Sequence, residues 1–292
     1  MTAVRPARGP SGARAGRVTL SSGDVSAAQS PSRARSTPAP PPPGGWLVGP
    51  PDYVGVGAAQ AGTAWWDRLI LAHPAVERAP GIPPGIDHFR DRWRDGLDEA
   101  GVSAYHAWFP RPAGCLVGEW TPGYMLDAWV APLLRRSAPD ARLLALLRDP
   151  VARFGAGQRE DEGRERLGVT PRAAANASFS RGLYADQVLR LWSSYPRDRV
   201  LVLQVERCLR EPRSQLRRTY AFLGLDPDVA DEVDVRLPLD PPQASPRLEL
   251  DPPQAAALAR AYAPENARLA ELLPDLDLGL WTRPGTPARS PR

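Results

Sequence analysis

From residue 52 onward, short apolar runs alternate with longer stretches in which apolar and polar positions are mixed. The segments "YVGVG" (53–57) and "GCLVGEW" (114–120) are β-like runs. "ARLLALLRDP" (141–150) and "RVLVLQVE" (199–206) are almost continuously apolar. Because continuous rather than alternating hydrophobicity is typical of strands buried on both faces of a parallel sheet, these runs predict the strands of such a sheet.

Helical patterns lie between the predicted strands. After Thr63, which is placed to cap a helix, apolar positions recur at the i, i+3, i+4, i+7 spacing until Pro74. "ADQVLRLWSSY" (185–195) and "SQLRRTYAFLGLDP" (214–227) also follow helical patterns, and Gly224 is a typical helix C-terminus. Strands that alternate with helices predict an α/β fold, a single domain with a central, mainly parallel sheet flanked by helices.

The loops that follow the predicted strands form the candidate ligand site. In open parallel sheets, ligands bind at the carboxyl ends of the strands. The loops 57–63, 119–124 and 148–156 each follow a predicted strand. We therefore expect these loops to converge on one pocket, with Glu119 at its mouth.

The first of these loops has the glycine spacing of a nucleotide-binding P-loop. Gly57 and Gly62 are separated by four residues, but Thr63 and Ala64 occupy the positions of the P-loop Lys and Ser/Thr. A loop that leads into a helix N-terminus favours an anion, because backbone N–H groups and the helix dipole point at it. The loop is a candidate anion site; the alternative is a tight turn whose small residues serve only packing.

Composition bounds the remaining possibilities. The net charge is +4 and all 37 basic residues are arginine, so an arginine has to fill any role that lysine usually has. Residues 1–48 and 283–292 are rich in Arg, Pro and Ser and have little to bury, which predicts a disordered N-terminal tail and a flexible C-terminal tail. Cys115 and Cys208, in apolar strand-like surroundings, predict buried free thiols and a cytoplasmic location.

Three segments, "GVGAAQAGTAWW", "GEWTPGYM" and "LLRDPVARFGAGQ", resemble in order and spacing the sulfotransferases that use 3′-phosphoadenylyl sulfate (PAPS). The nearest likeness is to the heparan-sulfate-type, carbohydrate branch and its bacterial relatives. The segments 181–201, 200–227 and 273–281 also resemble landmarks of that family, so the likeness covers about residues 52–282. It implies a P-loop-like sulfotransferase domain over residues 49–282.

The resemblance also implies the reaction and its partners. A sulfuryl group moves from PAPS, the co-substrate, to a hydroxyl or amine of a carbohydrate or small-molecule acceptor, and no metal is needed. Glu119 opens the family's E-x-[ST]-P signature, in which the carboxylate takes the acceptor's proton. The alternative for Glu119 is a solvated glutamate at a strand end, or one paired with a core arginine.

The same resemblance assigns the cofactor contacts. The first loop wraps the 5′-phosphosulfate, and Arg148 matches the arginine that binds the 3′-phosphate. An ion pair between Arg148 and Asp149 or another acid is the alternative. The cofactor-binding residues implied in this way are Gln60, Ala61, Gly62, Thr63, Ala64, Trp65, Arg148, Ala156 and Arg247.

Three positions depart from the family pattern. Gln60, also a candidate catalytic residue, replaces a lysine that assists the leaving phosphate, and Ala156 replaces a serine that contacts the 3′-phosphate. Arg247 is the obvious cation of "QASPRLEL" (243–250), where the family has a cationic cofactor loop. These departures keep a second hypothesis open, namely a catalytically impaired relative that binds adenosine 3′,5′-bisphosphate or a partner.

Two other classes of protein fit the sequence less well. A P-loop NTPase or kinase would have the Walker lysine where Thr63 stands, and an acidic strand end for magnesium. A nucleic-acid-binding protein would have a recognition motif beside its basic segment, whereas the arginines of residues 1–48 are scattered among prolines. The chain also lacks an apolar stretch near the roughly 20 residues that span a bilayer. We therefore expect neither nucleic acid nor membrane as a partner.

Overall fold

The computed structural model describes residues 38–157, 168–235 and 250–281. The described residues belong to one compact unit that starts at Pro38. The predicted tails lie mostly outside the described ranges, and the domain limits therefore stay predictions.

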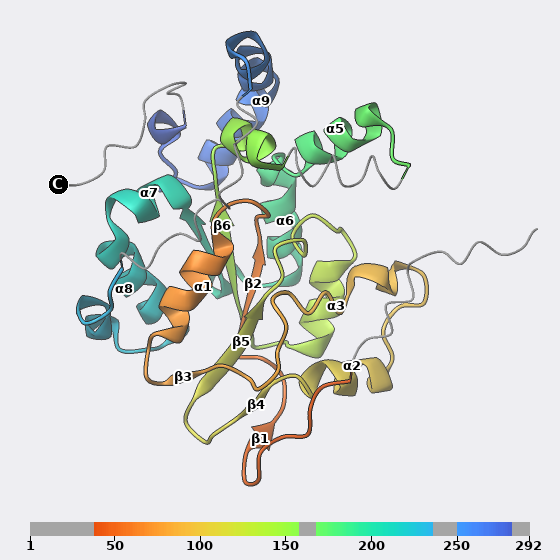
Figure 1. The fold of residues 1–292 in the computed structure, drawn as a ribbon, viewed down its shortest axis with the longest axis vertical. Coiled ribbons are helices and arrows are strands. Elements are labelled where there is room, and N and C mark those ends of the chain that lie inside the picture. Colours follow the sequence, from red (N-terminus) through yellow and green to blue (C-terminus); the bar gives the residue numbers. More distant parts are fainter. Residues whose placement is uncertain (1–37, 158–167, 236–249, 282–292) are drawn as a thin grey trace, which may run out of the picture. The chain divides into compact units, whose positions relative to one another are not determined.

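A five-stranded sheet forms the centre of the fold, and all its strand pairs are parallel. The spatial order is β3-β5-β2-β6-β7, so β2, the first of these strands along the chain, lies in the middle of the sheet (Figure 1). The α/β prediction is thereby confirmed, and the carboxyl ends of β5, β2 and β6 lie side by side. The strands are β2 (Tyr53–Gly57), β3 (Val76–Glu77), β5 (Leu116–Trp120), β6 (Arg142–Leu147) and β7 (Val200–Gln204).

A second, two-stranded sheet pairs the start of the described chain with a later segment. In it, β1 (Leu47–Val48) lies antiparallel to β4 (Pro110–Arg111). The Arg111 side chain also forms an ion pair with Asp52 at 3.2 Å, next to the start of β2. This small sheet thus ties the entry of the central strand to the segment that leads into β5.

Helices cover both faces of the central sheet (Figure 1). Helices α1 and α8 pack together on one face, and α3 and α6 pack together on the other. None of the helices in the described ranges is long and apolar enough to cross a membrane. The helices are α1 (Thr63–Leu71), α2 (Glu99–His106), α3 (Val130–Ser137), α5 (Pro171–Ser180), α6 (Tyr184–Ser194), α7 (Val205–Arg210), α8 (Pro212–Leu223) and α9 (Pro252–Leu272), with a further helical stretch at 150–157 and 3₁₀ turns at Arg90–Trp93, Arg197–Arg199, Pro227–Asp231 and Leu278–Leu280.

Helix α1 has the apolar spacing predicted, but Gly62 and not Thr63 occupies its N-cap, and no side chain caps it. Its apolar side is buried, and the indole Nε1 of Trp66 donates to the Thr219 hydroxyl of α8 at 3.2 Å. The Tyr220 hydroxyl donates to the carbonyl of Leu69 at 2.6 Å. Helix α8 ends at Gly224, which has φ 76°, as predicted from the sequence. These contacts fix the direction of α1 and therefore the position of its N-terminus.

Both cysteines are free, as predicted, but only one of them is fully buried and neither lies in a strand. Cys208 is buried but lies in helix α7, and Cys115 is half-buried in the turn before β5. The apolar run that contains Cys208 changes from strand to helix at Val205, a boundary that hydrophobicity alone does not mark. Burial raises the pKa of the Cys208 thiol well above its usual range, so this thiol stays protonated.

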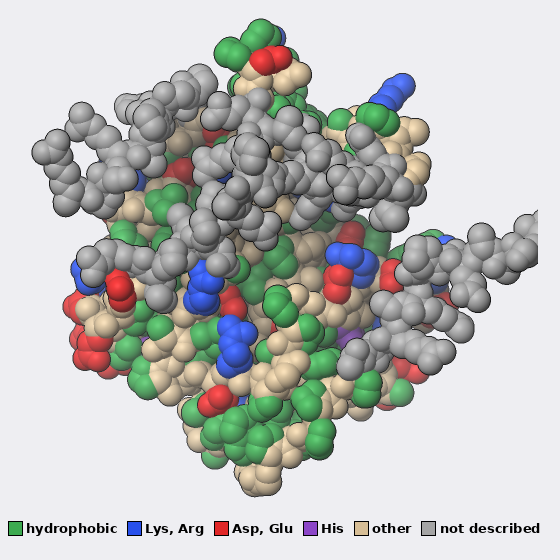
Figure 2. All heavy atoms as spheres, viewed as in Figure 1, with side chains coloured by type: hydrophobic (Ala, Val, Ile, Leu, Met, Phe, Trp, Pro, Cys, Tyr) green, Lys and Arg blue, Asp and Glu red, His purple; other side chains and the backbone are tan. Residues whose placement is uncertain are grey.

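Basic and acidic side chains are mixed on the surface. On the face drawn in Figure 2, arginines and carboxylates of the described residues are interspersed among hydrophobic side chains. A protein that binds the phosphates of nucleic acid gathers its cations into a stripe or patch. Among the residues coloured on this face, the charges have no such arrangement.

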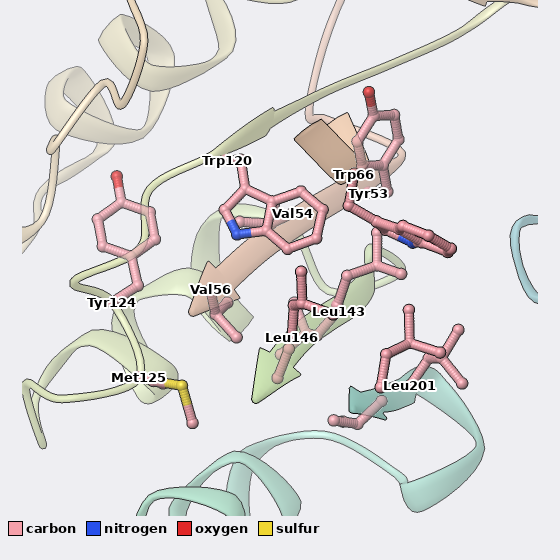
Figure 3. Packing of buried hydrophobic residues seen from close by; sticks show 14 of the residues in the cluster. Tyr53, Val54, Val56, Trp66, Trp120, Tyr124, Met125, Leu143, Leu146 and Leu201 are labelled. Carbon is pink, nitrogen blue, oxygen red and sulfur yellow. The ribbon is translucent and has the colours of Figure 1, made fainter. Parts of the chain in front are cut away.

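Two glycines of β2 let another segment lie directly on the strand. A Cβ atom at Gly55 would stand 2.0 Å from Cδ2 of Trp120, and one at Gly57 would stand 1.9 Å from Sδ of Met125. The backbone continues this contact beyond β5, because the N–H of Met125 donates to the carbonyl of Val56 at 2.8 Å. Figure 3 shows Trp120 and Met125 beside β2 in the core. Residues 120–125 are thus held along the central strand.

We expect Gly55→Ala to lower the free energy of unfolding by about 1–3 kcal/mol, the usual cost of overpacking a core. The added methyl group meets the Trp120 ring, which cannot move away without disturbing the sheet. Gly49→Ala is the matched control, because nothing lies within 4 Å of a Cβ at that position. Urea unfolding of both variants measures the difference. Equal stabilities would contradict the close contact of Trp120 with β2.

Candidate active site

A cleft of about 700 Å³ opens at the carboxyl ends of β2 and β5. It is bounded by the loop between β2 and α1, by the segment after β5 and by the turn Arg90–Trp93. The first two predicted loops therefore meet in one cleft. The described residues that line it are Ala59, Gln60, Gly62, Thr63, Ala64, Arg90, Asp91, Trp93, Pro122, Gly123, Leu126, Asp127, Trp129 and Arg181.

The loop between β2 and α1 turns through two residues with positive φ. Gly62 has φ 79° and occupies the N-cap position of α1, and Gln60 has φ 66°. The left-handed conformation costs little for glycine, which explains why a glycine stands immediately before the helix. Between them, the N–H of Ala61 donates to the carbonyl of Ala58 at 3.2 Å, and the Ala61 side chain is buried. The loop is tight, and its exposed side faces the cleft.

The start of α1 has the backbone groups that an anion needs. The N–H of Trp65 donates to the Gly62 carbonyl at 3.1 Å. The N–H groups of Thr63 and Ala64 have no acceptor among the described residues. Both residues line the cleft, and the positive end of the helix dipole lies at the same place. This helix end therefore fits a phosphate or phosphosulfate group.

Trp65 contributes to the core rather than to the cleft lining. Its side chain is 3% exposed and packs edge to face against Trp66, with 5.0 Å between ring centroids. The Trp65 side chain is outside the cleft lining, and the assignment of Trp65 to cofactor binding stays a prediction.

Arg148 follows β6 and touches the first loop. Its Nη1 donates to the backbone carbonyl of Gln60 at 2.9 Å, and its own carbonyl accepts from the Tyr184 hydroxyl at 3.0 Å. Asp149 accepts instead from the N–H of Val151 at 2.9 Å, and no ion pair joins it to Arg148 within the described ranges. Arg148 thus stands beside the first loop, although it is outside the cleft lining.

The loop after β6 is tied down by a buried carboxylate. Glu206, in the first turn of α7, accepts from the N–H of Asp149 at 2.9 Å and from the indole of Trp281 at 2.9 Å. Burial raises the pKa of Glu206, although these two hydrogen bonds act against the shift. The hydrogen bond between Asp149 and Glu206 thus connects the chain after β6 to the chain after β7, next to Arg148.

Glu119 is enclosed by hydroxyl groups. Its side chain is 4% exposed and outside the cleft lining, so it is not at the mouth where we expected it. The Tyr105 hydroxyl donates to its Oε1 at 2.8 Å and the Thr121 hydroxyl to its Oε2 at 2.5 Å. Neither a solvated carboxylate nor a pair with a core arginine describes it. Pro122 and Gly123, immediately after Thr121, line the cleft.

The surroundings of Glu119 shift its acidity toward neutral pH. Desolvation by burial raises the pKa of Glu119 to about 7, although the hydrogen bonds from Thr121 and Tyr105 lower it. The Tyr105 hydroxyl stays protonated, because burial raises its pKa well above the usual range. Thr121 also accepts from the N–H of Asp87 at 3.3 Å. A carboxyl group with a pKa near 7 is suited to exchange a proton at neutral pH.

The remaining predicted residues lie farther along the chain. Ala156 is half-buried in the helical stretch 150–157, and its methyl group can form no hydrogen bond. In the same stretch, the guanidinium of the fully buried Arg153 donates to the carbonyl of Ser178. Arg247 lies outside the described residues, as does the run 158–167 after Ala156.

The sequence did not indicate several residues that line the cleft. Trp93 and Asp127 lie outside every motif, and Arg181 precedes helix α6 by three residues. They meet only because the turn Arg90–Trp93 and the segment after β5 fold together. The nearest sequence signals are the segment 181–201, which begins at Arg181, and the glutamate signature at Glu119, which comes eight residues before Asp127.

Comparison with known proteins agrees with this geometry. Residues 121–230 match the profile of the Sulfotransferase family. Human heparan sulfate glucosamine 3-O-sulfotransferase 6 is 27% identical over 194 residues, which are 62% of this chain and 54% of that protein. The mouse 3-O-sulfotransferase 3B1 is 28% identical over 195 residues, 62% of this chain and 48% of that protein. The chain thus spans about half the length of these curated relatives.

A solved structure extends the likeness over the fold. A sulfotransferase from Alicyclobacillus acidocaldarius superposes with a TM-score of 0.59 and 27% identity, over 81% of this chain and 100% of that one. The matched profile begins at Thr121, next to the buried Glu119, and includes Arg148 and the carboxyl ends of β6 and β7. The parallel sheet, the loop that leads into α1 and these similarities together show that the chain resembles the sulfotransferases.

Proposed function

We propose that this chain transfers a sulfuryl group from PAPS to a hydroxyl or amine of a carbohydrate or small-molecule acceptor. The observation that carries the proposal is the pair of unsatisfied N–H groups of Thr63 and Ala64 in a cleft at the start of α1. They stand in a chain whose residues 121–230 match the Sulfotransferase family. The names of the curated relatives refer to a heparan sulfate sugar, which supports a carbohydrate among the acceptors.

The donor half of the site would bind through charge and backbone groups. When bound, PAPS supplies an activated sulfuryl group whose transfer leaves adenosine 3′,5′-bisphosphate. The N–H groups of Thr63 and Ala64 would hold the 5′-phosphosulfate, with the close turn at Ala61 and Gly62 allowing the backbone to approach. Arg148 would bind the 3′-phosphate, because it is the cation beside this loop at the end of β6.

Glu119 would act as the general base. Its pKa of about 7 leaves a large share ionised at neutral pH, and the ionised form can take the acceptor's proton. The hydroxyls of Tyr105 and Thr121 would fix the orientation of the carboxylate. Glu119 is close to the cleft along the chain, since Pro122 and Gly123, three and four residues later, line it.

Gln60 would be the weak point of the mechanism. Negative charge builds on the leaving phosphate, and a neutral amide stabilises it less than a cation does. Gln60 lines the cleft, and Arg148 already contacts its backbone carbonyl. The Gln60 side chain would then donate one hydrogen bond to the leaving group.

A second candidate function follows from the same substitution. With Gln60 and Ala156 in place of a lysine and a serine, the chain would bind adenosine 3′,5′-bisphosphate without transferring sulfate efficiently. Calorimetric titration with the bisphosphate and transfer of labelled sulfate from PAPS separate the two. Binding together with transfer supports the enzyme, whereas binding without transfer to a broad set of acceptors supports the second candidate.

The first prediction of this function concerns affinity. We expect Arg148→Ala to weaken binding of adenosine 3′,5′-bisphosphate by about 1.5–3 kcal/mol, roughly 10- to 150-fold in Kd, because a charge-assisted contact is lost. Gln60→Ala removes a neutral donor and costs about 1 kcal/mol, roughly fivefold. Arg218→Ala, at an exposed ion pair with Asp275, is the control. Calorimetry ranks the three variants, and equal losses for Arg148→Ala and Gln60→Ala would contradict the assignment.

The second prediction concerns how the turnover rate depends on pH. The wild-type turnover rate should rise with pH, by about tenfold per unit, and level off above about pH 7, since a base works only when ionised. Glu119→Gln should lower kcat by roughly 100-fold or more and abolish this rise, with bisphosphate affinity unchanged. Glu99→Gln, at an exposed pair with Arg136, should leave the profile intact. A wild-type profile that is flat between pH 5 and 8 would remove Glu119 from the mechanism.

The third prediction concerns position 60, where Gln60 stands in place of a cation. Gln60→Lys should raise kcat by about tenfold, equivalent to about 1.4 kcal/mol of barrier, and tighten bisphosphate binding less than that. Gln60→Met is the matched control, because it has similar length but no donor, and it should lower kcat. Steady-state kinetics with PAPS gives both values. An unchanged or lower kcat for Gln60→Lys, with binding intact, would mean that Arg148 or another group already assists the leaving phosphate.

A further inference from the structure

The turn Arg90–Trp93 and the segment after β5 form one side of the cleft, and this side carries two tryptophans. Trp93 is 56% exposed at the end of its 3₁₀ turn, and the Arg94 guanidinium lies 4.6 Å from its ring centroid. Trp129 is half-buried, and its indole Nε1 donates to the carbonyls of Phe89 and Arg90 at 3.1 and 3.2 Å. Both indoles line the cavity, so this side offers flat apolar surface. Such surface, with a few polar groups, is typical of a site for an organic ligand.

The cleft lining carries no excess of cations, because its two arginines, Arg90 and Arg181, are matched by two aspartates. Arg90 forms an ion pair with Asp87 at 2.8 Å, so its positive charge is compensated. Asp91 and Asp127 line the same cavity, and neither forms an ion pair with an arginine of the described ranges. Arg181, the other cation of the lining, is 9% exposed. An acceptor with many negative charges would meet these two carboxylates in the cleft lining without a surplus of cations to offset them.

Asp127 differs from Glu119 in its contacts. Both oxygens of Glu119 accept hydrogen bonds from hydroxyl groups of the chain. The Asp127 carboxylate is half-buried in the cleft lining and accepts no hydrogen bond from any described residue. Burial raises its pKa and nearby Asp87 raises it further, while Arg90, Arg181 and Arg190 lower it. A hydroxyl group of a ligand in the cleft would satisfy this carboxylate.

We propose that this side of the cleft binds an uncharged glycoside as the acceptor, with the sugar against Trp93 and Trp129 and one sugar hydroxyl donating to Asp127. The inference rests on the proposed function, because it names the acceptor of the same site. It distinguishes this chain from an enzyme that modifies a polyanionic glycan, whose acceptor side has to carry an excess of cations. The two tryptophans provide the area for binding, and Asp91 and Asp127 provide the discrimination by charge.

The test compares two probes that differ in one charge. 4-Nitrophenyl β-D-glucoside and 4-nitrophenyl β-D-glucuronide share the aglycone and the ring, and only the second has a carboxylate. With the protein saturated by adenosine 3′,5′-bisphosphate, we expect the glucoside to bind roughly tenfold more tightly than the glucuronide, since like charges repel at short range. Tighter binding of the glucuronide would overturn the inference, as would binding of 4-nitrophenol as tightly as the glucoside.

Substitutions test whether the Asp127 carboxylate causes the preference for the glucoside over the glucuronide. Asp127→Asn should reduce the ratio between the two affinities by roughly fivefold or more, with bisphosphate affinity unchanged. Asp95→Asn is the matched control, because Asp95 is exposed on the neighbouring segment and outside the cleft lining. Trp93→Ala should weaken both glycosides by a similar factor, since the shared ring loses its contact. A ratio that stays the same in Asp127→Asn and Asp95→Asn would overturn the role of Asp127.

Two failures are distinguishable in this design. If the protein binds the bisphosphate but neither glycoside, the inference about the acceptor is wrong and the donor half of the proposed function stands. If the protein binds no bisphosphate and transfers no sulfate from PAPS, the proposed function itself is wrong, and the acceptor inference fails with it.

Discussion

The direct contact between residues 120–125 and the glycines of β2 is the constraint on which the site depends. Gly55 and Gly57 leave room for Trp120 and Met125, and the backbone N–H of Met125 bonds to β2 at 2.8 Å. A side chain at either glycine would push this segment away from the central strand. The contact therefore brings the end of β5, which carries Glu119, next to the loop that leads into α1. The cleft exists because these two strand ends cannot separate.

The sheet also divides the chemistry of the site between strands. The centre strand leads to the N–H groups at the start of α1, where a helix end attracts an anion. The strand on one side, β6, leads to Arg148, and the strand on the other, β5, carries Glu119. The candidate anion site and a carboxylate of raised pKa thus lie at the ends of neighbouring strands, and the hydroxyls of Tyr105 and Thr121 enclose that carboxylate, Glu119. This separation fits a base that should not repel an anionic donor.

The sequence predicted the sheet well, because strands that are buried on both faces consist of continuous runs of apolar residues. It also predicted the helix after Thr63 and the end of α8 at Gly224, which depend on local spacing and on one favoured conformation. The burial of Glu119 was not predictable, because one of the hydroxyls that encloses it, Tyr105, comes from α2. Asp127 belongs to no motif either. Its place in the cleft follows from tertiary contacts between segments distant in sequence.

A crystal structure of the complex with adenosine 3′,5′-bisphosphate would test the proposed donor site most directly. We predict that the 5′-phosphate lies within hydrogen-bond distance of the N–H groups of Thr63 and Ala64. We predict the 3′-phosphate in contact with the guanidinium of Arg148, on the side of the loop where Gln60 lies. A nucleotide bound elsewhere on the chain, or a 5′-phosphate that makes no contact with the start of α1, would contradict the proposed donor site.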